Sequence, residues 1–244
     1  MGKLDGKVAI ITGASSGFGR GAAYAFAAEG CNLVLVARRE ERLKEVVEKI
    51  EKENKVTAIY YVGDVRKEET AINSIRLAMD TFGKIDILIN NAGMGIAQSF
   101  LDATMDDYDL IMDTNVRSAF AFSKHVIPEM LKNKSGQIIL VSSVTGIYGR
   151  GNEGAYTCSK FAIRGLAQSL NMELTKQGIQ VGVFCPHAGV TEFEIGSGRD
   201  AAEWAKTGYL TPEDAGQALL SMCTQTGNAY IAELRLASNN VIYR

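Results

Sequence analysis

The sequence predicts an α/β fold, with one domain built on a doubly wound parallel sheet of about seven strands. Short β-branched runs alternate with stretches of helical periodicity along the 244 residues. Several of the runs are apolar throughout, which is typical of strands covered by helices on both faces. No Pro/Gly/Ser-rich linker, sequence repeat or low-complexity tract divides the chain, so residues 1–244 are expected to form a single domain.

Seven segments are expected to be strands, and the order of elements predicts right-handed crossovers between them. They cover residues 8–12, 33–36, 57–62, 85–89, 137–142, 180–184 and 229–236. The charged run 40–55 carries an apolar stripe formed by Leu43, Val46, Val47 and Ile50. Its Glu and Lys residues are therefore interpreted as the solvated face of a helix and not as a binding patch.

Composition excludes several classes of function. The chain is 46% hydrophobic and 22% charged with a net charge of −2, which gives no bulk reason to bind nucleic acid or an anionic membrane. Its four cysteines are scattered without C-x-x-C spacing, and it has only two histidines, so we expect no metal site. No signal peptide or membrane-spanning run is evident in the sequence. We therefore expect a reducing, cytoplasmic location.

A glycine-rich turn follows the first expected strand. The segment Thr12-Gly13-Ala14-Ser15-Ser16-Gly17-Phe18-Gly19-Arg20 leads into an Ala-rich helix. Gly13 would permit the tight turn, Gly17 would let the backbone approach a pyrophosphate, and Gly19 would let helix and strand pack closely. An ordinary turn also uses glycine, but the strand–turn–helix context favours a Rossmann-type nucleotide site at the helix N-terminus.

The end of the second strand indicates the kind of cofactor. A carboxylate there would accept hydrogen bonds from a ribose 2′-hydroxyl, whereas a basic residue accommodates a 2′-phosphate. The chain has Ala37 at that position, followed by Arg38 and Arg39, and Ser15 and Ser16 add hydroxyl groups nearby. The alternative is that the two arginines merely begin a charged helix. Without a carboxylate at the strand end, we expect NADP(H) to be favoured over NAD(H).

Ser143, Tyr156 and Lys160 form a candidate catalytic group. Tyr156 and Lys160 are four residues apart in a helical segment, so their side chains share one face. Hydride transfer to a carbonyl needs a proton donor at the developing alkoxide, and the reverse reaction needs a base. A free tyrosine titrates near ~10, and a neighbouring ammonium favours its phenolate. A Tyr-x-x-x-Lys pair by itself usually means a surface helix.

Together, these motifs resemble the short-chain dehydrogenase/reductase family, and the resemblance extends over nearly the whole chain. It rests on the G-x-x-x-G-x-G turn, Asn90-Asn91-Ala92-Gly93 after the fourth strand, and the Ser143, Tyr156 and Lys160 group. The resemblance implies that Tyr156 is the acid/base, that Lys160 lowers its pKa and holds the nicotinamide ribose, and that Ser143 bonds the substrate oxygen. Asn115 would position a water in the proton relay.

The same resemblance implies a path for the cofactor along the turn and the strand ends. Asp64 and Val65 would contact the adenine ring. The full set of implied cofactor residues comprises Gly13, Ser15, Ser16, Gly17, Phe18, Gly19, Arg38, Arg39, Asp64, Val65, Asn91, Ala92, Gly93, Tyr156, Lys160, Pro186, Gly189 and Thr191.

The last family element departs from the usual pattern. Relatives read Pro-Gly followed by x-Val/Ile-x-Thr, whereas this chain reads Pro186-His187-Ala188-Gly189-Val190-Thr191. His187 replaces a glycine that would allow unusual backbone angles, and Gly189 replaces a β-branched residue. His187 is interpreted either as a substrate ligand or as a bulky residue tolerated near the pocket.

The stretch 191–210 is expected to form a substrate lid. Tyr148, Arg150, His187 and Arg199 could together favour a small polar or anionic aldehyde or ketone, although rim arginines are more often solvated. The family resemblance implies a homotetramer or homodimer packed through the helix that carries Tyr156 and through the C-terminal region. We therefore predict an oxidoreductase that transfers a hydride between NADP(H) and a carbonyl or alcohol. The alternatives are an NAD-dependent alcohol dehydrogenase and a non-catalytic nucleotide-binding regulator of the same fold.

Overall fold

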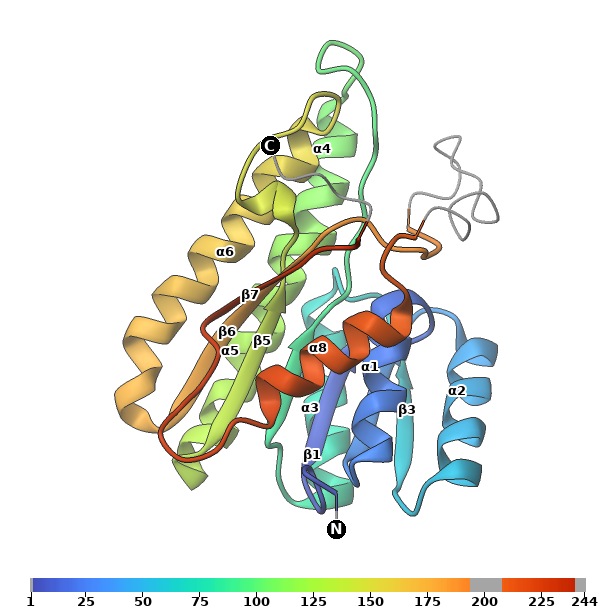
Figure 1. Cartoon of the computed structure of the whole chain (residues 1–244), viewed down its shortest axis with the longest axis vertical. Coiled ribbons are helices and arrows are strands. Elements are labelled where there is room, and N and C mark those ends of the chain that lie inside the picture. The colour runs from blue at the N-terminus through green and yellow to red at the C-terminus, as the bar shows by residue number, and fades with distance from the viewer. Residues whose placement is uncertain (1, 194–207, 240–244) are drawn as a thin grey trace.

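A seven-stranded, all-parallel sheet forms the centre of the molecule (Figure 1). The computed structural model describes residues 2–193 and 208–239. Within this part of the chain the strand order is β3-β2-β1-β4-β5-β6-β7. The strands are β1 (Val8–Thr12), β2 (Asn32–Ala37), β3 (Ala58–Val62), β4 (Ile87–Asn90), β5 (Gly136–Val141), β6 (Ile179–Pro186) and β7 (Glu233–Leu236). The order reverses between β1 and β4, which is where ligands bind in open sheets of this kind.

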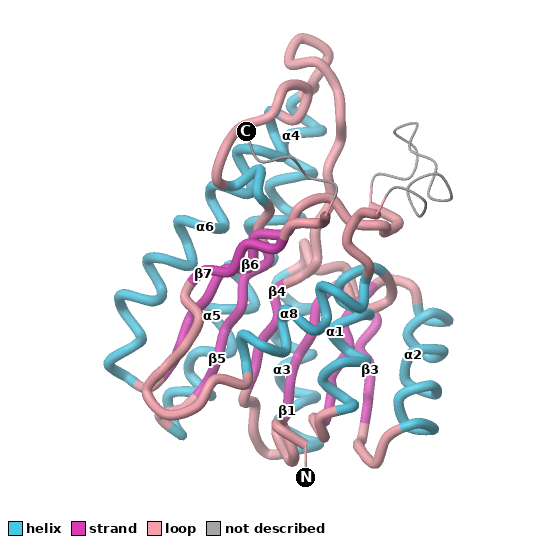
Figure 2. Tube along the Cα trace, viewed as in Figure 1, coloured by secondary structure: helices cyan, strands magenta, loops and turns pink. Residues whose placement is uncertain are grey.

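Helices cover both faces of the sheet (Figure 2). They are α1 (Gly17–Ala28), α2 (Glu40–Glu53), α3 (Glu68–Phe82), α4 (Met105–Met112), α5 (Ser118–Asn133), α6 (Gly154–Leu174) and α8 (Pro212–Cys223). Pro128 lies inside α5 and marks no domain boundary. The fold is a Rossmann-like α/β domain, as the alternating sequence pattern predicts.

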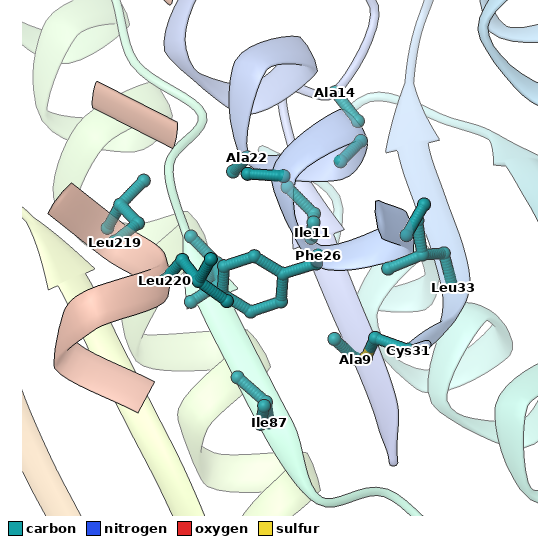
Figure 3. Packing of buried hydrophobic residues seen from close by; sticks show 14 of the residues in the cluster. Ala9, Ile11, Ala14, Ala22, Phe26, Cys31, Leu33, Ile87, Leu219 and Leu220 are labelled. Atoms are coloured by element: carbon teal, nitrogen blue, oxygen red, sulfur yellow. The ribbon is translucent and has the colours of Figure 1, made fainter. Parts of the chain in front are cut away.

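Alternating side chains of each strand build two separate cores. In β1, Ala9 and Ile11 join a cluster with Phe26 of α1 and Leu219 of α8, which Figure 3 shows. Ile10 points to the opposite face and joins the cluster formed with α3, α5 and α6. Both faces of the central strands are therefore buried, which explains why these strands are apolar throughout.

Helix α8 packs directly across α1. A Cβ atom at Gly21 would lie 1.8 Å from the Pro212 carbonyl oxygen, and one at Gly216 would lie 2.4 Å from the Gly21 carbonyl oxygen. Only glycine allows the two backbones to approach this closely. The chain entering α8 is thereby held beside the glycine-rich turn that precedes α1.

The observed strands agree with the sequence prediction except near their ends. Strand β7 begins at Glu233, although 229–236 was expected. Its backbone pairing with β6 starts at the pair Val183 and Glu233. Strand β4 begins at Ile87 and not at residue 85, and its pairing with β1 starts at the pair Ala9 and Ile87.

Candidate active site

A cleft of about 580 Å³ opens at the carboxyl ends of the strands. Its volume is in the range typical of small-molecule and cofactor sites. The turn after β1, the ends of β2 to β6, and Tyr156 and Lys160 of α6 all contribute to its lining. Seventeen of the eighteen residues that the family resemblance implies for the cofactor line the cleft, and so does Ser143; Gly19 does not.

The glycine-rich turn brings the backbone close to β4. Gly13 has a φ of +68°, and a Cβ atom there would lie 2.9 Å from Asn91 Nδ2. Gly19 is packed behind the turn, because a Cβ atom at this position would lie 2.5 Å from the Gly13 carbonyl oxygen. The Ser16 side chain does not cap α1, so the N–H groups of the first helical turn are not used by that hydroxyl. This end of α1 is suited to bind an anion such as a pyrophosphate.

Asn91 ties the turn to the end of β4. Its backbone N–H donates to Thr12 Oγ1 at 2.9 Å, and its Nδ2 donates to the Thr12 carbonyl at 2.9 Å. The Ala92 N–H donates to the same hydroxyl at 3.0 Å. Asn91 and Ala92 line the cleft together with Gly93, and they also hold β1 and β4 in register at the switch point.

Two arginines line the cleft at the end of β2. Arg38 and Arg39 are both exposed there. Arg39 Nη2 donates to Ser16 Oγ at 2.7 Å and to Ser15 Oγ at 3.2 Å. Its Nη1 forms an ion pair with Glu192 at 2.6 Å. The arginine therefore joins the glycine-rich turn to the segment that follows β6.

Asp64 lies at the end of β3 beside Val65, and both line the cleft. The Asp64 carboxylate accepts hydrogen bonds from Arg66 Nε at 2.9 Å and 3.0 Å and from the Arg66 N–H at 3.0 Å. The hydrogen bond from the Arg66 side chain holds the Asp64 pKa below its ordinary value. The carboxylate is thus ionised and fixed by its neighbour.

Tyr156 and Lys160 lie together on the buried face of α6. Lys160 Nζ is 5.5 Å from the centroid of the Tyr156 ring and donates to the Val141 carbonyl at 3.0 Å. The lysine is 4% exposed, and burial lowers its pKa to about 8. A desolvated lysine beside a tyrosine is the arrangement that acid/base chemistry requires of this pair.

Ser143 lines the cleft next to them. Its Oγ accepts a hydrogen bond from the Thr145 N–H at 3.1 Å, at the start of the 3-10 turn Val144–Gly146. The bond orients the hydroxyl and leaves its proton available to another acceptor.

Asn115 lies behind the cleft lining, in the π-helical turn Asp113–Arg117. Its Oδ1 accepts from the Met94 N–H at 2.8 Å, and its Nδ2 donates to the Met94 carbonyl at 2.8 Å and to Ser159 Oγ at 2.9 Å. Ser159 Oγ in turn donates to the Tyr156 carbonyl at 2.7 Å. The Asn115 side chain therefore connects the end of β4 to the turn of α6 that carries Tyr156.

Pro186, Gly189 and Thr191 line the cleft after β6, together with His187. His187 is 5% exposed, and its backbone N–H donates to the Leu236 carbonyl at 2.8 Å. It does not adopt a left-handed φ, so this position has no need of glycine. Burial, reinforced by the charges of Arg150 and Arg235, lowers the pKa of His187.

The predicted substrate residues are only partly brought together. Arg150 and His187 line the cleft, whereas Tyr148 is 40% exposed and is not among the lining residues. Arg199 and most of the expected lid lie outside the described residues, which include only 191–193 and 208–210 of that stretch.

Glu192 and Phe193 also line the cleft; they belong to the stretch expected to form the lid, but neither was given a role of its own from the sequence. The Phe193 ring lies 5.6 Å from the Tyr156 ring, at an interplanar angle of 56°. No local pattern could have identified these residues, because their position depends on the path of the chain after β6. Among the described residues no group of His, Cys, Asp and Glu side chains could hold a metal ion. No helix in the same part of the chain is both long and apolar enough to cross a membrane.

The fold and the cleft define a dinucleotide-dependent oxidoreductase. Residues 7–201 match the family model described as short chain dehydrogenase. The chain belongs to the short-chain dehydrogenase/reductase family, and it is therefore an oxidoreductase that uses a nicotinamide cofactor.

Individual relatives agree with this assignment. The chain is 42% identical over 187 residues to the oxidoreductase UcpA of Salmonella typhimurium, covering 76% of this chain and 70% of UcpA. The structure is similar to the alcohol dehydrogenase of Thermococcus sibiricus in complex with 5-hydroxy-NADP, with a TM-score of 0.89, 25% identity, and coverage of 98% of this chain and 99% of the other. It is also similar to the 3-ketoacyl-(acyl-carrier-protein) reductase of Brucella melitensis in complex with NADH, with a TM-score of 0.88, 29% identity, and coverage of 98% and 100%.

Proposed function

We propose that this oxidoreductase prefers NADP(H) and interconverts a small polar or anionic aldehyde or ketone with its alcohol. The proposed reaction is inferred from one observation: Tyr156 lies beside the buried Lys160 in a cleft that Ser143 also lines. The nicotinamide ring, when bound, supplies or accepts the hydride. A protein that only bound a nucleotide would have no use for this acid/base group, which argues against the regulator alternative.

Side chains of the protein would transfer the proton to and from the substrate oxygen. In reduction, the Tyr156 hydroxyl donates its proton to the carbonyl oxygen as negative charge develops there. Lys160 stabilises the resulting phenolate through its ammonium, and Ser143 donates a hydrogen bond to the same substrate oxygen. In oxidation, the phenolate takes the alcohol proton. Asn115 would support this proton transfer indirectly, because its side chain holds Met94 and the turn of α6 that carries Tyr156. That Asn115 also positions a water stays a prediction.

The preference for NADP(H) rests on charge at the end of β2. Arg38 and Arg39 line the cleft where the ribose 2′ position is expected, and no carboxylate ends the strand. Arg39 already bonds Ser15 and Ser16, so its guanidinium is held at the mouth of the glycine-rich turn. A guanidinium can bind a phosphate through two parallel hydrogen bonds. An NAD-dependent alcohol dehydrogenase would share the catalytic residues but would not benefit from these arginines.

The substrate class rests on Arg150 and His187. Both line the cleft, as Ser143 does. The positive charge of Arg150 helps to lower the pKa of His187. A neutral imidazole and a guanidinium can both hydrogen-bond a polar substrate group. Glu153 also lines this end and accepts a hydrogen bond from Thr145 Oγ1 at 3.4 Å. We expect one polar or anionic substituent close to the reacting carbonyl.

We also propose that the chain self-associates as a dimer or tetramer through α5 and α6. Phe120 on α5 is 56% exposed, and Phe161 and Met172 on α6 are 44% and 85% exposed. Large apolar side chains exposed in this way favour burial against a second copy. Light scattering should give a mass of two or four chains, and Phe161→Glu should lower it. A monomer at all concentrations would refute self-association.

The first experiment is a fluorescence titration with NADPH and NADH, followed by turnover of a panel of carbonyl compounds. We expect NADPH to bind more tightly. Tyr156→Phe should lower turnover at least about 100-fold while cofactor binding persists. Tyr24→Phe on α1, far from the cleft, is the matched control and should keep full turnover. Equal or tighter binding of NADH would reject the cofactor preference, and binding without any turnover would favour the regulator.

A further inference from the structure

The segment that follows β6 carries a carboxylate into the cationic end of the cleft. Glu192 forms ion pairs with two arginines of neighbouring elements, Arg39 just before α2 and Arg42 in its first turn. One carboxylate oxygen contacts each guanidinium, and the Arg39 contact is 2.6 Å. All three side chains keep about 35–44% of their surface exposed. Glu192 and Arg39 both line the cleft.

Arg39 is shared between this carboxylate and the glycine-rich turn. Its Nη1 faces Glu192, while its Nη2 bonds Ser16 Oγ at 2.7 Å and Ser15 Oγ at 3.2 Å. Partial burial raises the Glu192 pKa, but the two arginines outweigh it and hold that pKa below its ordinary value. The carboxylate is therefore charged at neutral pH. It occupies an N–H donor of Arg39 that a 2′-phosphate on the cofactor ribose would need.

We propose that Glu192 is a specificity-determining residue that competes with the cofactor 2′-phosphate for Arg39. The inference rests on the proposed site for a 2′-phosphate at Arg39, and it adds an element that opposes the proposed preference for NADP(H). A carboxylate and a phosphate offer the same kind of oxygen acceptors to a guanidinium, so the two anions exclude each other there. The 2′-phosphate must displace Glu192 from Arg39, whereas a ribose 2′-hydroxyl carries no charge that requires this exchange.

The competition can be measured without turnover, using ligands that contain only the adenosine end of the cofactor. Calorimetric titration with 2′,5′-ADP and with 5′-AMP isolates the 2′-phosphate. Glu192→Gln should tighten binding of 2′,5′-ADP about fivefold, as expected for loss of a competing, half-exposed ion pair. Binding of 5′-AMP should change less than about twofold. The gain should shrink at high salt, because salt screens exposed charges.

Two further variants make the test specific. Glu41→Gln removes the same charge from an exposed position of α2, where Glu41 pairs with Lys44, and should leave both affinities unchanged. In an Arg39→Gln background, Glu192→Gln should lose most of its effect, because the shared guanidinium is gone. Glu192→Ala should behave like Glu192→Gln.

The results separate this inference from the proposed function. An equal gain for 5′-AMP and 2′,5′-ADP would overturn the inference, because it would indicate a general charge effect. No gain for 2′,5′-ADP would overturn it as well. The wild-type ratio of NADPH to NADH affinity tests the proposed preference separately. If the wild type prefers NADH and Glu192→Gln still tightens 2′,5′-ADP, the preference fails and the role of Glu192 stands.

Discussion

The ring of Phe18 occupies the space that a side chain at position 189 would need. A Cβ atom on Gly189 would lie 2.3 Å from Phe18 Cζ and 2.5 Å from Phe18 Cε1. Phe18 lies in the glycine-rich turn and Gly189 follows β6, and both line the cleft. Gly189 stands where the family pattern has a β-branched residue. The structure gives a reason, since the aromatic ring in this position leaves no room for a branched side chain unless the ring moves.

This relationship predicts strong coupling between positions 18 and 189. Gly189→Val should destabilise the protein by about 1–3 kcal/mol through overpacking against Phe18. Phe18→Ala in the same chain should recover at least about 1 kcal/mol of that loss. Urea unfolding of the two single variants and the double variant measures the coupling. Gly149→Val is the control, since a Cβ atom there meets only Thr157 Cγ2 at an ordinary 3.6 Å. Additive effects of the two substitutions would contradict the prediction.

Lys160 should lower the stability of the cofactor-free protein. Burial lowers its pKa from 10.5 to about 8, so the unfolded chain binds more protons between these values. Stability therefore rises with pH across this window, and the cost of the buried ammonium is fully present below it. Lys160→Met should stabilise the protein at pH 7 by about 2–3 kcal/mol. It should also abolish turnover.

The pH dependence provides the check on this prediction. Thermal unfolding of the wild type and Lys160→Met should differ most at pH 7 and much less above pH 10.5, where the lysine is neutral in the folded state and mostly neutral in the unfolded state. Lys176→Met, on the exposed 3-10 turn Thr175–Gln177, should show no such pH-dependent gain. A less stable Lys160→Met at pH 7 would mean that the Val141 carbonyl compensates for the buried charge.

Asn115 should be sensitive to loss of its donor group. Asn115→Asp replaces Nδ2 by a carboxylate oxygen. Nδ2 donates to the Met94 carbonyl and to Ser159 Oγ, and the new oxygen cannot donate to either of them. We expect a loss of about 2–3 kcal/mol at pH 7 together with reduced turnover, because the Tyr156 turn loses its support. Part of the stability should return at low pH, when the new carboxyl is protonated. Asn152→Asp, at an exposed site, should be neutral, and equal losses in both variants would contradict the role of Asn115.

Arg150 should discriminate between charged and neutral substrates. Arg150→Ala should raise KM for an anionic carbonyl compound about tenfold, since a charge-assisted hydrogen bond is lost. KM for a neutral compound of similar size should change little. Arg117→Ala is the control, because Arg117 is 71% exposed and pairs with Asp113. Equal effects on both substrates would remove Arg150 from substrate recognition.

Much of the site could be predicted because its signals are local. The turn Gly13–Gly19 and the pair Tyr156 and Lys160 are each contained within one turn or one helix, so spacing alone brings their groups together. Strand ends could be predicted only approximately, as the later start of β7 at Glu233 illustrates. The start of this strand is set by its backbone pairing with β6, which begins at Val183 and Glu233 and which a local pattern does not encode.

The sequence by itself determined the α/β class, the parallel sheet and the placement of Tyr156 and Lys160 on one face of a helix. These follow from the period of the apolar residues and from short-range spacing, which hold whatever the rest of the chain does. Only the tertiary structure decided that Glu192 pairs with Arg39, that Asn115 supports Tyr156 through Ser159, and that Phe18 requires Gly189. Each of these contacts joins residues far apart in the chain, and their meeting depends on how the loops pass over the carboxyl ends of the strands.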